Sequence, residues 1–232
     1  MPYLPRWDKG KEIGTGQRDG DGRYRAIRKY LEDNQIEPGS DTGLAILDFG
    51  AWNGYFSRRL ADDFDANCTA VDNVPELEPY PGVAVINRRI QPDEITGTYD
   101  VVIAMSVLHH LENWRDYFAK FLEVAPVVFL EVAAPNEVLP KAKAHNNSKA
   151  IMRAVKAKKL GGTVIAETPG YDSKHLRPLI VIDQRENRPS RTDSTEENGP
   201  SRTEVLRREE RHYRPAASAH PSSVSLMASS FR

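Results

Sequence analysis

The sequence has little cysteine, no long apolar run and almost no net charge, and each shortage excludes a class of protein. Its one cysteine, Cys68, excludes an internal disulfide framework and a zinc site of several cysteines, and we assign no metal ligands. No segment approaches the roughly 20 apolar residues that cross a bilayer, and the first residues lack the apolar stretch of a signal peptide. We therefore expect a soluble, cytoplasmic protein without a membrane partner.

The formal net charge of -1 argues against a protein that coats nucleic acid through a general positive field. Basic residues are nevertheless concentrated in one segment, 141–159, which holds seven Lys or Arg and no acid. Such a segment would attract an anionic substrate, for example a phosphorylated metabolite, a glycan or RNA. The alternative is a solvated helix face whose charge balances acidic residues elsewhere.

Short apolar segments alternate with helical patterns through the middle of the chain. Strands are expected at 44–50, 68–72, 83–87, 99–105 and 126–132, and helices at 53–65 and 111–124. This alternation predicts a parallel sheet with helices on both faces. Two further strand-like runs within 161–183 flank a short loop and should pair antiparallel. The predicted fold is therefore α/β, a Rossmann-like, doubly wound and mostly parallel sheet with a C-terminal antiparallel hairpin.

Three regions follow from the distribution of apolar residues. Residues 1–43 are expected to form an arm, read as loop over its first 20 residues, and then a helix over 21–34. Residues 44–183 contain nearly all the strongly apolar runs and form the main domain. Residues 184–232 are rich in Arg, Glu, Ser and Pro, so they cannot bury enough apolar surface to fold, and we predict a disordered tail.

The most informative stretch is ILDFGAWNGYFSRRL (46–60), an expected strand that turns through glycines into a helix. Gly50 permits a tight turn and close approach of the backbone to a ligand, and Gly54 opens the helix without an obstructing side chain. Asp72 ends the next strand, 22 residues beyond Gly50, where a carboxylate can accept hydrogen bonds from both hydroxyls of a ribose. The alternative is that Gly50 and Gly54 are only turn residues and that Asp72 is only a helix cap.

The ribose ligand is not expected to be a dinucleotide, because Trp52 and Asn53 crowd the turn and a third glycine is missing. The stretch instead resembles the first motif of class I S-adenosylmethionine-dependent methyltransferases, an acid followed by glycines. Asp72 matches the ribose-binding acid of that family, and residues 99–111 resemble its fourth strand and the segment after it. The C-terminal hairpin is also typical of the family, so the resemblance covers residues 44–183. Trp52 stands where members often have glycine.

The resemblance implies S-adenosylmethionine as the cofactor. The residues it implies as cofactor-binding are Asp48, Gly50, Trp52, Asn53, Gly54, Asp72, Asn87 and Met105. Trp52 would either flank the methionine part of the cofactor or pack on the N-terminal helix. Asn87 is the candidate for the adenine ring, with Arg88 as the competing choice. An N-terminal helix often closes over the cofactor in this family, so Arg18 or Arg23 could meet its carboxylate.

A general base is required only if the methyl acceptor must lose a proton, as a hydroxyl must. His109 and His110 follow the expected fourth strand, at the edge of the sheet that opens to ligands. Consecutive residues point in different directions, so at most one should face the site, and we select His110. Glu131 is a weaker candidate. The alternative is that one histidine caps the next helix and the other packs.

The sequence lacks the motifs of two classes of DNA methyltransferase, which reduces the range of possible methyl acceptors. DNA amino-methyltransferases carry an Asp/Asn-Pro-Pro-aromatic motif where this chain has Ala104-Met105-Ser106-Val107, and DNA cytosine enzymes need a nucleophilic cysteine. Cys68 opens an apolar strand instead, so we do not expect a DNA acceptor. We expect methyl transfer to oxygen or nitrogen of a small molecule, sugar or RNA, an anionic one among the options. A non-catalytic module of the same fold and a nicotinamide-dependent oxidoreductase are the alternatives.

Overall fold

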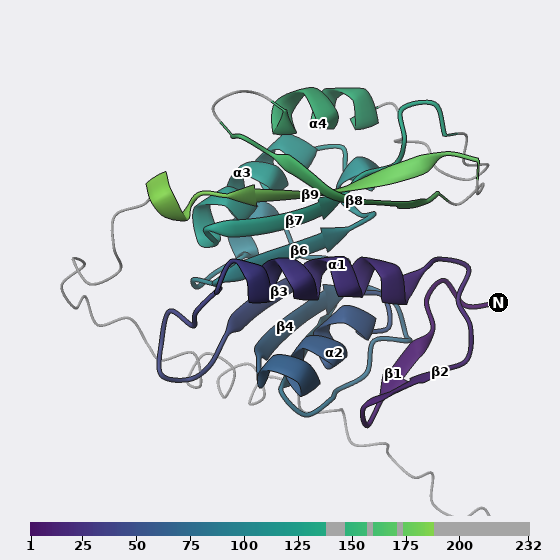
Figure 1. Cartoon of the computed structure of the whole chain (residues 1–232), viewed down its shortest axis with the longest axis vertical. Helices are drawn as coiled ribbons and strands as arrows, with labels where there is room; N and C mark the ends of the chain where they lie inside the picture. Colours follow the sequence, from purple (N-terminus) through teal and green to yellow (C-terminus); the bar gives the residue numbers. More distant parts are fainter. Residues whose placement is uncertain (138–146, 157–159, 171–173, 188–232) are drawn as a thin grey trace, which may run out of the picture. The chain divides into compact units, whose positions relative to one another are not determined.

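The computed structural model describes residues 1–137, 147–156, 160–170 and 174–187. Its centre is a seven-stranded sheet (Figure 1). The strands are β3 (Ala45–Phe49), β4 (Asn67–Asp72), β5 (Val83–Asn87), β6 (Val101–Met105), β7 (Val127–Glu131), β8 (Thr163–Pro169) and β9 (Leu176–Asp183). The α-helices are α1 (Gly20–Asp33), α2 (Tyr55–Phe64), α3 (Trp114–Val124) and α4 (Ser148–Val155).

The strand order is β5-β4-β3-β6-β7-β9-β8. Strands β3 to β7 pair in parallel, whereas β9 runs antiparallel to both β7 and β8. The predicted doubly wound sheet with a C-terminal antiparallel hairpin is thus confirmed. All five parallel strands end at one edge, where β9 begins, so residues just after these strands lie along a single edge of the sheet.

Both faces of the sheet are buried at β3, β6 and β7, which explains why these strands are almost entirely apolar rather than alternating. Along β3, Ile46 belongs to the hydrophobic cluster that contains α1 and α2, whereas Leu47 belongs to the cluster that contains α3 and α4. The first cluster includes Tyr24 of α1, and the second includes Phe121 of α3. Successive residues of a strand point to opposite faces, so one apolar run supplies both cores.

The N-terminal arm differs from the expected loop, because it contains a β-hairpin of β1 (Arg6–Asp8) and β2 (Lys11–Ile13). Its turn places Lys9 and Gly10 at φ 48° and 74°, the left-handed conformation of a tight hairpin. The indole nitrogen of Trp7 donates to a carboxylate oxygen of Asp62 in α2 at 2.8 Å. Strands of three residues carry no readable alternation, so this hairpin was missed.

The folded domain also continues beyond the predicted boundary at residue 183. The backbone nitrogen of Gln184 donates to the Pro126 carbonyl, and Arg185 donates to the Asn34 carbonyl at 2.9 Å. A 3-10 turn, Arg185–Asn187, follows. Residues 188–232 of the predicted tail lie outside the described residues, as do residues 138–146 and 157–159 around α4.

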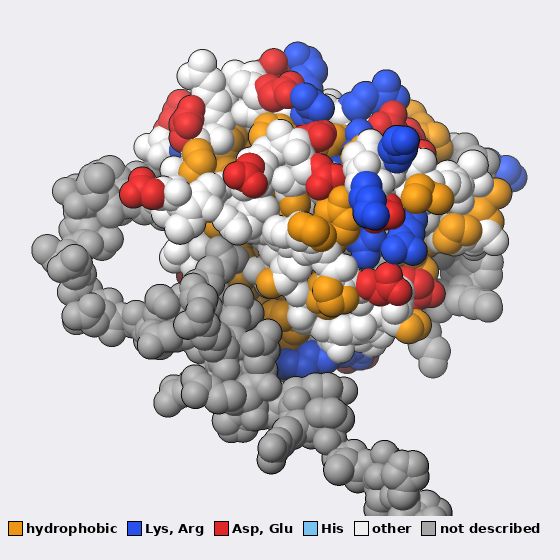
Figure 2. Space-filling view, turned by 90° about the horizontal axis from the view of Figure 1, so that it is seen from below, with side chains coloured by type: hydrophobic (Ala, Val, Ile, Leu, Met, Phe, Trp, Pro, Cys, Tyr) orange, Lys and Arg blue, Asp and Glu red, His pale blue; other side chains and the backbone are white. Residues whose placement is uncertain are grey.

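The described surface carries both signs of charge. Figure 2 shows acidic and basic side chains interspersed among hydrophobic and uncharged ones on the face of the molecule seen from below, in agreement with the near-zero net charge. None of the helices in the described ranges is both long enough and apolar enough to cross a bilayer.

Candidate cofactor site

The turn between β3 and α2 is built on left-handed backbone positions. Gly50, Trp52 and Gly54 have φ values of 79°, 54° and 74°. The backbone nitrogens of Gly50 and Ala51 both donate to the Val71 carbonyl at the end of β4, at 2.8 and 3.1 Å. Glycine adopts this conformation without strain, so the two glycines explain how the chain turns directly from the strand into the helix.

Gly50 also permits close packing with the segment after β6. A Cβ added at Gly50 would lie 2.6 Å from the Cβ of Val107, a separation that real side chains do not reach. The backbone at Gly50 therefore packs directly against the side chain of Val107, and no larger residue fits at position 50 without a shift.

Asp72 occupies the strand end predicted for the ribose acid. Its Oδ2 accepts from the backbone nitrogen of Trp52 at 2.8 Å, and its Oδ1 accepts from the backbone nitrogen of Asn73 at 2.7 Å. The side chain is only partly buried. A carboxylate has about four lone-pair sites, so each oxygen retains capacity for a further donor.

A pocket of about 560 Å³ opens at this edge of the sheet. It is lined by Phe49, Gly50, Val71, Asp72, Asn73, Arg88, Arg89, Ile90, Gln91, Val107, His110, Leu111, Glu112, Asn113 and Tyr117. These residues lie at or after the carboxyl ends of β3, β4, β5 and β6, apart from Tyr117 in α3. The volume lies within the range of small-molecule and cofactor sites. The pocket thus brings together Gly50, Asp72 and His110, which the sequence had selected separately.

Trp52 and Asn53 make contacts to the N-terminal arm. The ring of Trp52 lies 5.6 Å from that of Tyr3, so it packs on the N-terminal arm, which precedes the N-terminal helix α1. The amide of Asn53 donates to the Pro5 carbonyl at 2.9 Å and accepts from the backbone nitrogen of Tyr55 at 3.3 Å. Both residues fasten the arm to the turn.

Asn87 and Met105 make their contacts outside the pocket. The amide of Asn87 donates to the Val74 carbonyl at 3.0 Å and thus supports the loop after β4, whereas its competitor Arg88 lines the pocket. Met105 is buried in the core cluster that contains α1 and α2. Neither side chain is among those that line the pocket.

Asp48 lies inside β3 and is 1% exposed. Its Oδ2 accepts from the Ser57 hydroxyl at 2.6 Å, whereas its Oδ1 has no hydrogen-bond partner among the described residues. Burial raises the pKa of Asp48 to about 7 against the opposing effect of the Ser57 hydrogen bond, and the charge of Asp72 adds to the rise. An unpartnered buried carboxylate oxygen suits a cationic ligand group.

Asp48 should make stability depend on pH. Between the unfolded value of 3.8 and about 7, the folded carboxyl keeps its proton while the unfolded one loses it. The free energy of unfolding should therefore fall as pH rises from 5 to 7, with a contribution approaching about 1.4 kcal/mol per pH unit. Denaturant unfolding of Asp48→Asn should lack this contribution, whereas Asp93→Asn, at an exposed position, should keep it. Parallel curves for wild type and Asp48→Asn would contradict the assignment.

The two histidines have different surroundings. His109 is fully buried, and its Nδ1 accepts from the backbone nitrogen of Ala133 at 3.3 Å. His110 is exposed and lines the pocket, in a 3-10 turn, Leu108–His110, whose backbone bond runs from His110 to the Val107 carbonyl. One histidine faces the pocket and the other packs in the interior, as the change of direction between neighbours requires.

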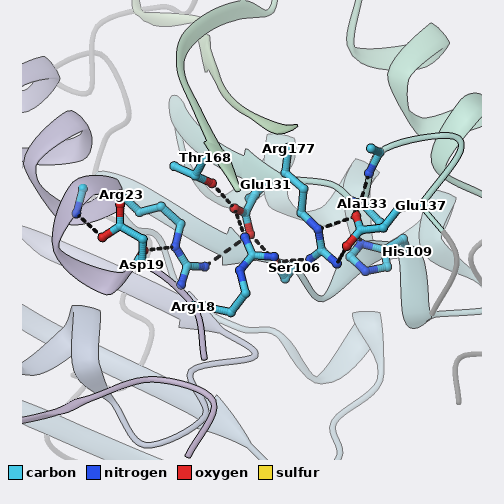
Figure 3. Close-up of polar contacts among 12 residues, drawn as sticks. Arg18, Asp19, Arg23, Ser106, His109, Glu131, Ala133, Glu137, Thr168 and Arg177 are labelled. Atoms are coloured by element: carbon cyan, nitrogen blue, oxygen red, sulfur yellow. Dashed lines mark hydrogen bonds and ion pairs between the residues drawn. The ribbon is translucent and has the colours of Figure 1, made fainter. Parts of the chain in front are cut away.

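A buried ionic cluster surrounds Glu131 (Figure 3). Glu131, at the end of β7, accepts from Arg18 at 2.6 Å and from Arg23 at 3.2 Å. Burial raises the pKa of Glu131, but the charges of Arg23 and Arg18 outweigh it and hold the pKa below its usual value. Glu131 is therefore a poor general base, and both arginines are bound to it.

The sequence analysis missed Arg177 and Ser106 as members of this cluster. Arg177, in β9, donates from Nη1 to the Ser106 hydroxyl at 2.9 Å, and Ser106 in turn donates to Glu131. The available signal was a charged or polar residue inside or directly after an apolar run, as in LRPLIVID and VVIAMS. Within the described ranges, no group of three His, Cys, Asp or Glu side chains is arranged to hold a metal ion.

Comparisons with known proteins agree with this geometry. The family model described as a methyltransferase domain matches residues 17–177, which is more than half of the chain. No curated protein sequence matches. Among solved structures, the bifunctional kinase-methyltransferase WbdD is similar with a TM-score of 0.59 and 21% identity, over 74% of this chain and 41% of that one. The chain thus spans about two fifths of WbdD.

Two further structures cover most of their own length. The magnesium protoporphyrin IX methyltransferase ChlM from Synechocystis PCC 6803, with bound SAH, has a TM-score of 0.52 and 18% identity, over 70% of this chain and 82% of that one. The N-terminal domain of EvdMO1, in the presence of SAH and D-fucose, has a TM-score of 0.51 and 15% identity, over 79% and 91%. The chain belongs to the methyltransferase-domain family and has the class I S-adenosylmethionine-dependent methyltransferase fold.

Proposed function

We propose that this protein binds S-adenosylmethionine in the pocket beside Gly50 and transfers its methyl group to oxygen or nitrogen of an acceptor. The observation that carries the proposal is the convergence of Gly50, Asp72 and His110 on one pocket at the carboxyl edge of the sheet. Ligands of open α/β sheets bind at this edge. The acceptor class remains a small molecule, a sugar or RNA.

The residues present fit the cofactor. Asp72 would accept from the ribose hydroxyls, and the segment Arg88–Gln91, which lines the pocket after β5, would lie along the adenine. The unpartnered Oδ1 of Asp48 suits the ammonium of the amino acid part, and the glycine turn leaves room for that part of the cofactor. The cofactor supplies a methyl group already activated on a sulfonium, so the protein's main task is to hold the acceptor in line with it.

Two of the similar structures support the cofactor assignment, because they contain SAH. They do not narrow the acceptor. One is named for a magnesium porphyrin and the other was crystallised with D-fucose, although both share the sheet. A fold hosts many substrates, so the acceptor must be argued from the residues around the site.

For a hydroxyl acceptor, we assign the general base to His110. It lines the cofactor pocket and is exposed, whereas the buried His109 has its Nδ1 occupied by the Ala133 backbone nitrogen. The neutral imidazole would take the acceptor's proton as the methyl group arrives.

Asp72→Ala should weaken binding of S-adenosylhomocysteine by about tenfold or more, because both ribose hydroxyls lose a charged acceptor. The change also releases the Trp52 backbone nitrogen that Asp72 holds. Isothermal titration calorimetry measures the effect. Asp93→Ala removes an exposed acid outside the pocket and should bind as wild type does. Micromolar binding of NAD, with no response to either form of the cofactor, would overturn the proposed function.

A further inference from the structure

Three arginines from separate parts of the chain meet where β6 and β7 end and β9 begins. Arg18 precedes α1, Arg23 lies in its first turns, and Arg177 lies in β9 (Figure 3). All three are at most 3% exposed. A buried guanidinium is costly unless it is paired, so the pairing of each one matters.

The carboxylates of the cluster are fewer than its guanidinium groups. Arg177 donates from Nε and Nη2 to the two oxygens of Glu137, each at 2.7 Å, which occupies that carboxylate. Glu131 is shared by Arg18 and Arg23. Three guanidinium groups thus face two carboxylates, which leaves one positive charge uncompensated among these five groups.

Glu131 is also saturated by neutral donors. The Thr168 hydroxyl donates to its Oε1 at 2.7 Å, and the Ser106 hydroxyl donates to its Oε2. With the two arginines, this makes four donors on one carboxylate, which is its ordinary capacity. Glu131 therefore has no room for the remaining guanidinium hydrogens.

The guanidinium hydrogens that remain without an acceptor indicate a ligand. The Nε and Nη1 of Arg18 and the Nη2 of Arg23 are buried and have no hydrogen-bond partner among the residues that the structure describes. Burial lowers the pKa of Arg18 against the attraction of Glu131, and the charges of Arg23 and Arg177 lower it further. Buried polar groups are normally paired, so three such nitrogens on two neighbouring arginines call for an acceptor.

The position of the cluster relates it to the acceptor side of the site. Ser106 adjoins Val107, which lines the cofactor pocket, and it has the strained φ of 57°. The pocket extends along the ends of β5, β4, β3 and β6, and the cluster continues along β6, β7 and β9. Asp72 and Glu131 end strands three apart, which corresponds to roughly 14 Å.

We propose that Arg18 and Arg23, aided by the charge of Arg177, bind an anionic group of the methyl acceptor, a phosphate or a carboxylate. This rests on the proposed function, whose acceptor it narrows to an anionic molecule. Glu131 holds the guanidinium groups in place, and the spare donors of Arg18 and Arg23 take the oxygens of the anion. Planar guanidinium forks suit both kinds of anion.

The test uses the full chain saturated with S-adenosylhomocysteine and titrated in the calorimeter with inorganic phosphate or acetate at constant ionic strength. We expect one of the two anions to bind, and the tighter one assigns the acceptor group. Arg18→Gln removes most of the spare donors, so it should weaken anion binding at least tenfold while changing the affinity for S-adenosylhomocysteine less than twofold. Arg153→Gln, at an exposed position of α4, controls for the general loss of charge.

Four outcomes would overturn the inference. If neither anion binds to the saturated protein, or if an anion binds only without the cofactor product, the cluster does not hold an acceptor group. If Arg18→Gln leaves anion binding unchanged, the anion binds elsewhere. If that variant does not fold, a wild-type crystal grown with product and anion decides, by showing or lacking the anion beside Arg18 Nη1 and Arg23 Nη2. Failure of S-adenosylhomocysteine itself to bind would instead overturn the proposed function.

Discussion

His110→Ala is expected to lower turnover by about 10²–10⁴-fold with a hydroxyl acceptor, while the affinity for S-adenosylhomocysteine changes little. His110 is exposed and lines the pocket, so its imidazole is available to a molecule bound there. The wild-type rate should rise with pH through the range in which the imidazole loses its proton, because the neutral form is the base. In the alanine variant this rise should disappear.

The neighbouring histidine provides the matched control. His109→Ala removes a buried ring and the acceptor of the Ala133 backbone nitrogen, so it should lower the melting temperature while turnover of the folded protein persists. Steady-state kinetics and calorimetry on both variants separate the possible roles. An undiminished turnover in His110→Ala would refute the assignment of His110 as the general base. A large loss of affinity for S-adenosylhomocysteine would instead make His110 a cofactor-binding residue.

Gly50→Ala is expected to destabilise the fold by about 2–5 kcal/mol, because a left-handed backbone with a side chain and an overpacked contact both add cost. The φ of Gly50 is 79°, and the new Cβ would lie 2.6 Å from the Cβ of Val107. The β3 turn would have to move, so the affinity for S-adenosylhomocysteine should fall as well. Denaturant unfolding and calorimetry measure the two effects.

Gly97 separates the two causes of this destabilisation. It has a φ of 84°, yet a Cβ there would meet nothing within 4 Å, so Gly97→Ala should cost only the backbone contribution of about 1–2 kcal/mol. Val107→Ala cannot relieve the contact, because the nearest atom is the Cβ that alanine retains. In a Val107→Gly background, Gly50→Ala should cost no more than Gly97→Ala does. If Gly50→Ala and Gly97→Ala lowered the free energy of unfolding equally in the wild-type background, the Val107 side chain would be able to move away from the new Cβ without destabilising the fold.

The sequence by itself determined the fold and the strand ends at which the pocket opens. Strands buried on both faces, such as β3, are read as short continuous apolar runs, and their alternation with helices dictates a parallel sheet. The carboxyl ends of parallel strands lie at one edge of the sheet. Gly50, Asp72 and His110 therefore had to line the same edge once each was assigned to the end of its strand. A left-handed turn requires glycine at a particular position, so this local requirement is visible in the sequence.

The tertiary structure alone decided where polar side chains find their partners. Trp52 and Asn53 contact Tyr3 and Pro5, nearly 50 residues earlier, so the turn motif could not show that they fasten the arm. Asn87 was placed correctly at its strand end, but its amide supports the loop after β4.

The arginine cluster is the clearest case of such long-range pairing. Arg18 and Arg177 meet around Glu131 and Ser106 only because β9 inserts beside β7 and the segment before α1 reaches the end of β7. Hydrophobic periodicity reports which face of an element is buried, but it contains no information on strand order or on distant charges. A buried charge needs a partner, and the fold determines which partner it receives.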